Sequence, residues 1–156
     1  MTVPVKSALV VDDSPTIRNF VSAALETAGF DVTLAKSGFE ALKVLKEALT
    51  RLNETAPGTD KSPFDLIVTD VNMPDINGLE LVKFVRQNKS EGLRRTPLVI
   101  ISTDGREKDR DRGMQLGATA YLVKPFQPEV LQELVGRILQ PGVNVAPQMV
   151  PFGQKR

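Results

Sequence analysis

The sequence predicts an α/β domain in which a parallel β-sheet lies between two layers of helices. Two observations lead to this prediction. Short aliphatic runs without polar alternation recur along the chain, a pattern typical of strands that are buried on both faces. Apolar residues at helical spacing follow each run, so that five predicted strands alternate with five predicted helices. With 156 residues, of which 41% are hydrophobic, the chain can form one such domain with a complete core.

The predicted strands consist mainly of aliphatic and β-branched residues. They cover residues 8–11, 32–35, 66–68, 98–101 and 120–123. Several are followed by residues that favour the start of a helix. Ser14 can cap a helix whose first turn contains Pro15. Ser37 and Glu40 form a capping box. The predicted helices cover approximately residues 15–28, 38–52, 77–85, 106–116 and 128–139.

Composition excludes several classes of function. The 20 basic and 19 acidic residues give a net charge of +1, so we expect neither nucleic acid nor a membrane surface as a partner. Cysteine and histidine are absent, which excludes thiolate and imidazole chemistry and is typical of a reducing compartment. No stretch approaches the ~18 apolar residues of a membrane span, and the start lacks the apolar core of a signal peptide. We therefore expect a cytoplasmic protein.

Polar side chains worth attention follow four of the five predicted strands. Asp12 and Asp13 follow the first strand, Asp70 the third, Ser102 the fourth and Lys124 the fifth. Because the carboxyl ends of parallel strands meet at one edge of a sheet, which is where ligands bind, these residues form a candidate site. Taken alone, each of these residues has an ordinary structural interpretation. An isolated Asp70 would start a turn, and the group could be an acidic edge that a lysine neutralises.

In this arrangement the chain resembles the receiver domain of response regulators over about residues 6–139. The resemblance rests on residues 11–14, residues 70–74 with Gly78, Ser102, and residues 121–126. Among receivers it is most similar to stand-alone chemotaxis regulators of the CheY type. The resemblance implies the doubly wound (βα)5, flavodoxin-like fold with strand order 2-1-3-4-5. It also implies a receiver domain at residues 1–140. The proline-rich tail at 141–156 has no apolar period, and we expect it to be too short to form an output domain.

That strand order places the first and third strands side by side, ~4.8 Å apart, which crowds three carboxylates. Two unit charges ~4 Å apart repel by ~4 kcal/mol at an effective dielectric constant near 20, so the cluster needs a cation. Oxygen ligands without nitrogen or sulfur favour a hard ion, and we expect Mg²⁺. The fifth strand lies ~10 Å from the third by the same spacing, a gap that the side chain of Lys124 could largely close.

The resemblance implies phosphoryl transfer to Asp70 from a phosphohistidine of a partner kinase. Asp13, Asp70 and the backbone carbonyl of Asn72 would hold Mg²⁺, and Asp12 would act through a metal-bound water. Lys124 would neutralise charge on the phosphoryl oxygens. The chain would catalyse its own phosphorylation and dephosphorylation without being a turnover enzyme.

The resemblance also implies a switch. Ser102 would move to bind the phosphoryl group, and Tyr121 would follow it inward. The expected output face consists of the fourth helix, the fifth strand and the fifth helix, and it would bind a downstream protein. A phosphatase is a further partner that the resemblance allows, and we expect a monomer. The Lys124–Pro125 bond is cis in this family.

Two features depart from the family. Thr103 follows the switch hydroxyl where Ala or Gly is usual, so its bulk could change access to the phosphoryl group. Residues 47–63 contain an insertion, which is either a surface loop and longer helix end or an element that binds a partner. The charges that alternate from Arg106 to Arg112 similarly indicate either a solvated helix face or a binding surface.

Other functions stay open to different degrees. Within the family, the chain could be a phosphate sink, a phosphorelay intermediate, or a receiver excised from a larger regulator or hybrid kinase. A flavin carrier of the same fold is disfavoured because Asp12 and Asp13 lie where a phosphate-binding loop should be. A hydrolase of the haloacid dehalogenase type expects a second acid two residues after its nucleophile, where this chain has Asn72.

Overall fold

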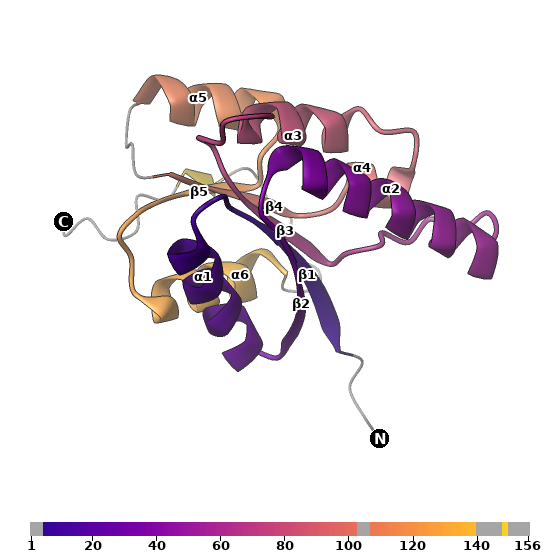
Figure 1. The fold of residues 1–156 in the computed structure, drawn as a ribbon, viewed down its shortest axis with the longest axis horizontal. Helices are drawn as coiled ribbons and strands as arrows, with labels where there is room; N and C mark the ends of the chain where they lie inside the picture. The colour runs from indigo at the N-terminus through magenta and orange to yellow at the C-terminus, as the bar shows by residue number, and fades with distance from the viewer. Residues whose placement is uncertain (1–4, 103–106, 140–147, 150–156) are drawn as a thin grey trace.

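The structure, a computed structural model, describes residues 5–102, 107–139 and 148–149. Its centre is one parallel sheet in the order β2-β1-β3-β4-β5-β6 (Figure 1). The strands are β1 (Lys6–Val11), β2 (Phe30–Ala35), β3 (Leu66–Asp70), β4 (Leu98–Ser102), β5 (Ala120–Val123) and β6 (Gln148–Met149). The helices are α1 (Pro15–Thr27), α2 (Gly38–Thr55), α3 (Gly78–Arg86), α4 (Glu91–Arg94), α5 (Glu107–Leu116) and α6 (Pro128–Ile138).

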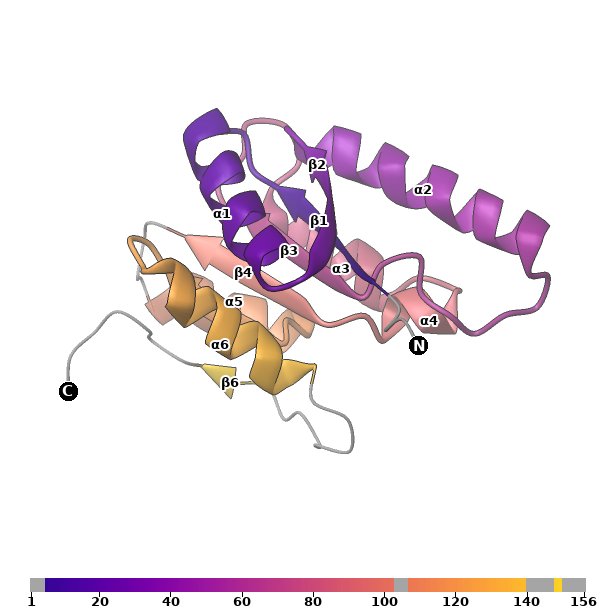
Figure 2. The same ribbon diagram turned by 90° about the horizontal axis from the view of Figure 1, so that it is seen from below.

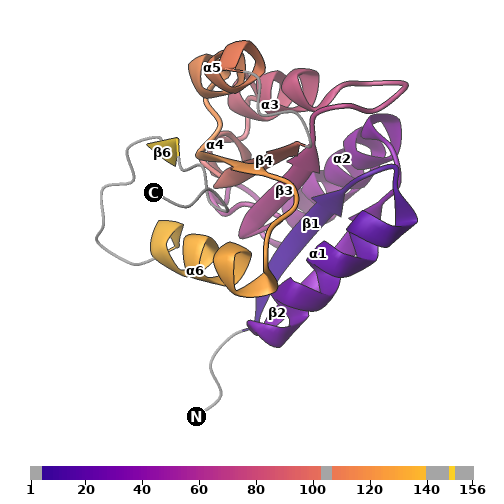
Figure 3. The same ribbon diagram turned by 90° about the vertical axis from the view of Figure 1, so that its left-hand side faces the viewer.

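Two helical layers cover the sheet, as the sequence predicted. Helices α1 and α6 lie on one face, and α2, α3 and α5 lie on the other (Figures 1 and 3). The side chains of β1 alternate between the two layers. Leu9 and Val11 belong to the core under α2 and α3, whereas Ala8 and Val10 belong to the core under α1 and α6. Burial on both faces explains why the strands carry continuous apolar runs.

The predicted strand order 2-1-3-4-5 is confirmed, and β6 extends it beyond the edge of β5. The register pairs Ala120 with Gln148 and Tyr121 with Met149. No strand was predicted there, because two residues are too few to show a strand pattern. The two edges of the described sheet are therefore β2 and β6.

The helix starts depend on the capping residues that the sequence indicates. The Ser14 hydroxyl accepts a hydrogen bond from the Ile17 N–H at 3.4 Å. The Ser37 hydroxyl accepts one from the Glu40 N–H at 3.0 Å, and the Glu40 carboxylate accepts one from the Lys36 N–H at 3.0 Å. These contacts fix where α1 and α2 begin, and with them the connections that leave the ends of β1 and β2.

Two stretches of the chain contain more helix than the residue ranges predicted from the sequence. Helix α2 continues to Thr55 and projects past the sheet (Figure 2), so residues 47–55 are helical and residues 56–65 form the connection to β3. The charged connection at residues 89–96 contains α4, a four-residue helix capped by Ser90. Such a helix is too short to show an apolar period. Among the described residues, no helix combines the length and the apolar character that a membrane span needs.

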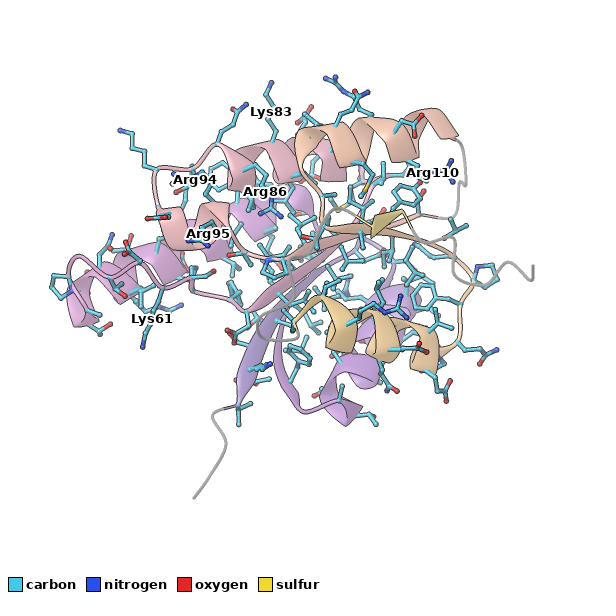
Figure 4. All side chains as sticks on the ribbon, turned by 180° about the vertical axis from the view of Figure 1, so that it is seen from behind. Lys61, Lys83, Arg86, Arg94, Arg95 and Arg110 are labelled. Carbon is cyan, nitrogen blue, oxygen red and sulfur yellow. The ribbon has the colours of Figure 1, made fainter. Side chains whose placement is uncertain are left out.

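Arg86 connects the end of α3 to two other segments, the one before β4 and the one before β5. Its Nε donates to the Gly117 carbonyl at 2.7 Å, and its Nη1 donates to the carbonyls of Thr96 at 2.6 Å and Arg94 at 2.9 Å. Its Nη2 donates to the Thr119 hydroxyl at 3.2 Å. Burial lowers the pKa of this guanidinium, which nevertheless stays charged because its ordinary value is so high. Figure 4 shows Arg86 directed into the structure from α3, while Lys83 points outward.

We expect Arg86→Ala to lower the free energy of unfolding by about 3 kcal/mol, because several acceptors lose their donor. Arg86→Lys should recover little of this loss, since a single ammonium cannot reach all four acceptors on two segments. Urea unfolding followed by circular dichroism measures both variants. Lys83→Ala, an exposed change on the same helix, is the control and should shift stability by no more than about 0.5 kcal/mol. A similar loss in the two alanine variants would contradict the role of Arg86.

Candidate functional site

The carboxyl ends of β1 and β3 bring three carboxylates together. The two strands are neighbours, with Val11 opposite Thr69, so Asp12 and Asp13 leave β1 beside Asp70 at the end of β3. One carboxylate oxygen from each acid lies within 4.8 Å of the other two. Asp12 and Asp70 are buried, and Asp13 is exposed. The arrangement can hold a metal ion, with Asp13 on its open side.

Lys124 reaches into this acidic cluster from β5. Its Nζ lies 3.4 Å from Oδ2 of Asp12 and 3.6 Å from Oδ1 of Asp70, and its side chain is only 9% exposed. The backbone holds the lysine in place, because the Lys124 N–H donates to the Ser102 carbonyl at 2.8 Å. The Lys124–Pro125 peptide bond is cis. A single ammonium therefore bridges the two buried carboxylates.

Opposing effects act on the carboxyl group of Asp70. Burial is the largest, and it raises the pKa. The positive charge of Lys124 lowers the pKa, whereas the negative charge of Asp12 raises it. Hydrogen bonds from the N–H groups of Asn72 and Val71 lower it again. Burial and Asp12 prevail, so the pKa of Asp70 lies above its ordinary value. A bound cation would add a further effect that favours the ionised form.

The second oxygen of Asp12 is already engaged, since Oδ1 accepts a hydrogen bond from the Ser14 N–H at 2.9 Å. The Asp12 backbone carbonyl accepts another from Nη1 of Arg18 at 2.8 Å. Arg18 was not among the predicted site residues, because a lone arginine on a polar helix face resembles ordinary surface. It ties the first turn of α1 to the end of β1.

The remaining predicted residues lie around this centre. Ser102, the last residue of β4, is fully buried, and Tyr121 is 1% exposed in the core under α2 and α3. Their strands are neighbours, with Ser102 opposite Val123. Asn72 is exposed, two residues past Asp70. Thr103, predicted to influence the switch, lies outside the described residues.

Gly78 permits the close approach that shapes the loop after Asp70. A Cβ atom there would lie within 2.5 Å of the Asp70 carbonyl oxygen, which no side chain tolerates. The Gly78 N–H donates to the Val71 carbonyl at 2.9 Å, and the side chain of Asn77 caps α3. The loop from β3 to α3 therefore turns back tightly onto the strand end.

An apolar groove of about 520 Å³ adjoins Lys124. It is lined by Thr16, Ile17, Phe20, Lys124, Pro125 and Phe126. The rings of Phe20 and Phe126 meet edge to face, with their centres 5.7 Å apart. Phe20 shares the apolar spacing of the buried residues of α1, such as Val21 and Ala24, and yet is 37% exposed at this groove.

The donor set fits a hard cation. The three side chains that could bind a metal together are all carboxylates, those of Asp12, Asp13 and Asp70. Ligands of this kind favour Mg²⁺, Ca²⁺ or Mn²⁺ over metals that prefer nitrogen or sulfur. Asp70 lies next to Lys124 and would lie next to such an ion, so its oxygen could attack an electrophile whose negative charge these cations would offset.

Asp70→Asn should unfold at a higher temperature than the wild type at neutral pH with a metal chelator present. A raised pKa in the folded state means that ionised Asp70 opposes folding, so stability falls as pH rises through that pKa. The difference between variant and wild type should disappear as pH falls below 3.8, the ordinary value for this group. Thermal unfolding over a pH series tests this. Asp31→Asn, at an exposed position on β2, is the control, and an Asp70→Asn protein no more stable than wild type would contradict the expectation.

Comparison with known proteins agrees with this geometry. Residues 8–136 match the response regulator receiver domain. The chain is 36% identical over 136 residues to a chemotaxis protein CheY homolog of Campylobacter jejuni, covering 86% of this chain and 92% of that protein. The high-resolution structure of the chemotaxis response regulator CheY4 of Vibrio cholerae matches with a TM-score of 0.68 and 36% identity, over 86% of this chain and 99% of that one. The transcriptional regulator PhoP of Bacillus subtilis is 35% identical, but the chain covers only 52% of it.

Proposed function

The chain belongs to the response regulator receiver family, and on that premise we propose that it accepts a phosphoryl group from a histidine kinase onto Asp70. Phosphorylation then changes the face with which it binds a downstream protein. The observation that carries the proposal is Lys124, which lies against both Asp12 and Asp70 at an acidic cluster able to hold a metal.

Mg²⁺ is the metal that we propose for this cluster. Asp13, Asp70 and the backbone carbonyl of Asn72 would hold it, with Asp12 acting through a bound water. The dication and Lys124 together balance three carboxylates. When bound, the metal supplies positive charge to the phosphoryl oxygens, which is much of what phosphoryl transfer requires.

The carboxylate of Asp70 is the proposed nucleophile. One of its oxygens forms a bond to phosphorus as the bond from phosphorus to the histidine nitrogen of the kinase breaks. The ammonium of Lys124, between Asp12 and Asp70, favours the ionised carboxylate and then contacts the transferred group. Attack of water on the same phosphorus releases phosphate and restores Asp70, so the chain ends its own signal and is not a turnover enzyme.

The proposed switch runs from Ser102 to Tyr121. Ser102 lies at the end of β4, where its hydroxyl would bind the phosphoryl group, and Tyr121 lies on the neighbouring strand β5. The proposed output face consists of α5, β5 and α6, which are the fourth helix, fifth strand and fifth helix of the predicted pattern. A chemotaxis or motility role is supported by the CheY homolog of C. jejuni, of which the chain covers 92%, against 52% of PhoP.

The groove beside Lys124 is the proposed docking site for the kinase. A phosphohistidine must come within bonding distance of Asp70, so the protein that carries it must contact this edge of the sheet. The groove is apolar, lies next to Lys124 and exposes part of Phe20. It fits an apolar helix face of the donor protein. A small phosphodonor needs no such surface.

Acetyl phosphate or beryllofluoride with Mg²⁺ should modify the wild-type protein at one site and leave Asp70→Asn unmodified. The amide of asparagine is not a nucleophile for phosphorus, although its shape preserves the fold. Intact-protein mass spectrometry for the phosphate adduct and fluorine NMR for beryllofluoride measure the result. Asp65→Asn, near the start of β3, is the control and should react as the wild type does. Equal modification of Asp70→Asn would refute the assignment of the phosphoacceptor.

Phe20→Ala should slow phosphotransfer from the kinase by about tenfold while leaving the reaction with acetyl phosphate unchanged. The variant removes an exposed ring from the groove but no group from the acidic cluster. Transfer from a radiolabelled, phosphorylated kinase, followed by gel electrophoresis, gives the first rate, and the adduct assay gives the second. Phe39→Ala removes another exposed ring, 68% exposed on α2, and should affect neither rate. An unchanged kinase rate in Phe20→Ala would place the docking surface elsewhere.

A further inference from the structure

The loop that follows Asp70 is tied to a helix far away in the sequence. Oδ2 of Asp75 accepts a hydrogen bond from the Phe39 N–H at 2.8 Å, and Oδ1 accepts one from the Gly38 N–H at 3.3 Å. Asp75 lies on the connection from β3 to α3, whereas Gly38 and Phe39 form the first turn of α2. Both oxygens of one carboxylate thus hold the start of another helix.

Helix α2 does not need Asp75 for its own cap. Ser37 already fills that role, with its hydroxyl bound to the Glu40 N–H. Asp75 instead takes the two preceding N–H groups, at the positive end of the helix dipole, where a carboxylate is favoured. The Phe39 hydrogen bond is the largest cause of the lowered pKa of Asp75, so this exposed side chain stays ionised. The contact works as a cross-link between the loop and α2.

Little space separates the loop from its neighbours at both ends, so its position is restricted. A Cβ atom on Gly38 would lie 2.7 Å from Cβ of Ile76 and closer still to the Ile76 carbonyl oxygen. At the other end of the loop, Gly78 packs against the backbone of Asp70 with equally little space. The loop is therefore held at Gly78 by β3 and at Asp75 by α2. Asn72, whose carbonyl is the proposed metal ligand, lies on the same loop, three residues before Asp75.

We propose that Asp75 is a positioning residue of the metal site: by bonding to Gly38 and Phe39 it sets where the Asn72 carbonyl points. The inference rests on the proposed function, because it concerns the Mg²⁺ that phosphorylation uses. Mg²⁺ demands near-octahedral geometry with short ligand distances, so a displaced carbonyl weakens binding. Residues that orient metal ligands typically change affinity by about 10- to 100-fold when they are replaced.

The test is a calorimetric titration of Mg²⁺ into the wild type, Asp75→Ala, Asp75→Asn and Glu80→Ala. We expect about tenfold weaker binding by Asp75→Ala and an intermediate loss in Asp75→Asn, whose amide oxygen can accept one of the two bonds. Glu80 is an exposed acid in the first turn of α3, so its replacement removes the same charge nearby and should leave the affinity unchanged. Thermal unfolding in a chelator establishes that each variant is folded.

Two further measurements separate positioning from a general loss of stability. Amide exchange at Phe39 should accelerate in Asp75→Ala, since its acceptor is gone. Phosphorylation of Asp75→Ala by acetyl phosphate should be slow at low Mg²⁺ but return to within about twofold of the wild-type rate at saturation.

Affinity within twofold of wild type in Asp75→Ala, or an equal loss in Glu80→Ala, would overturn the proposal while the function of Asp70 stands. Absence of Mg²⁺ binding by the wild type would instead overturn the proposed function and this inference with it.

Discussion

The contact between Lys124 and the buried carboxylates of Asp12 and Asp70 is the interaction on which the site depends. Burial and the nearby charge of Asp12 disfavour the ionised form of Asp70, and the ammonium of Lys124, 3.6 Å from Asp70 and 3.4 Å from Asp12, offsets part of this effect. Burial still prevails at Asp70, whose pKa is raised. The cluster therefore carries more negative charge than Lys124 alone offsets, and a bound cation would complete the balance.

The topology of the sheet brings the two acids and the lysine together. Because β1 and β3 are parallel neighbours, their final acids meet, and because β5 lies beyond β4, its lysine must reach across one strand. Gly78 then lets the chain turn back onto the end of β3 without pushing the strands apart. The polar side chains of the candidate site lie at the carboxyl edge of the sheet because every parallel strand ends there.

Other polar contacts hold the surroundings of the site in place. Arg18 holds the carbonyl of Asp12, and Asp75 holds the loop after Asp70 against α2. Arg86 instead joins α3 to the segments before β4 and β5, with hydrogen bonds to backbone carbonyls rather than to an acid. Arg18 and Asp12 are only six positions apart, whereas Asp75 and Phe39, and Arg86 and Gly117, are more than thirty positions apart in the chain.

Local patterns were enough to predict five strands, their helices and the residues at the carboxyl edge, because burial on both faces leaves continuous apolar runs and strand ends leave polar breaks. Family resemblance added the strand order. The sequence also led us to expect that Lys124 reaches toward the acids, but only the tertiary structure shows that it contacts both Asp12 and Asp70. Only the tertiary structure, likewise, decided the partners of Arg86, the exposure of Phe20 and the cross-link from Asp75 to Phe39. The sequence determines the chemical type of each side chain. Its contact partner depends on how distant segments pack together, and Lys124 and Asp12 are 112 positions apart.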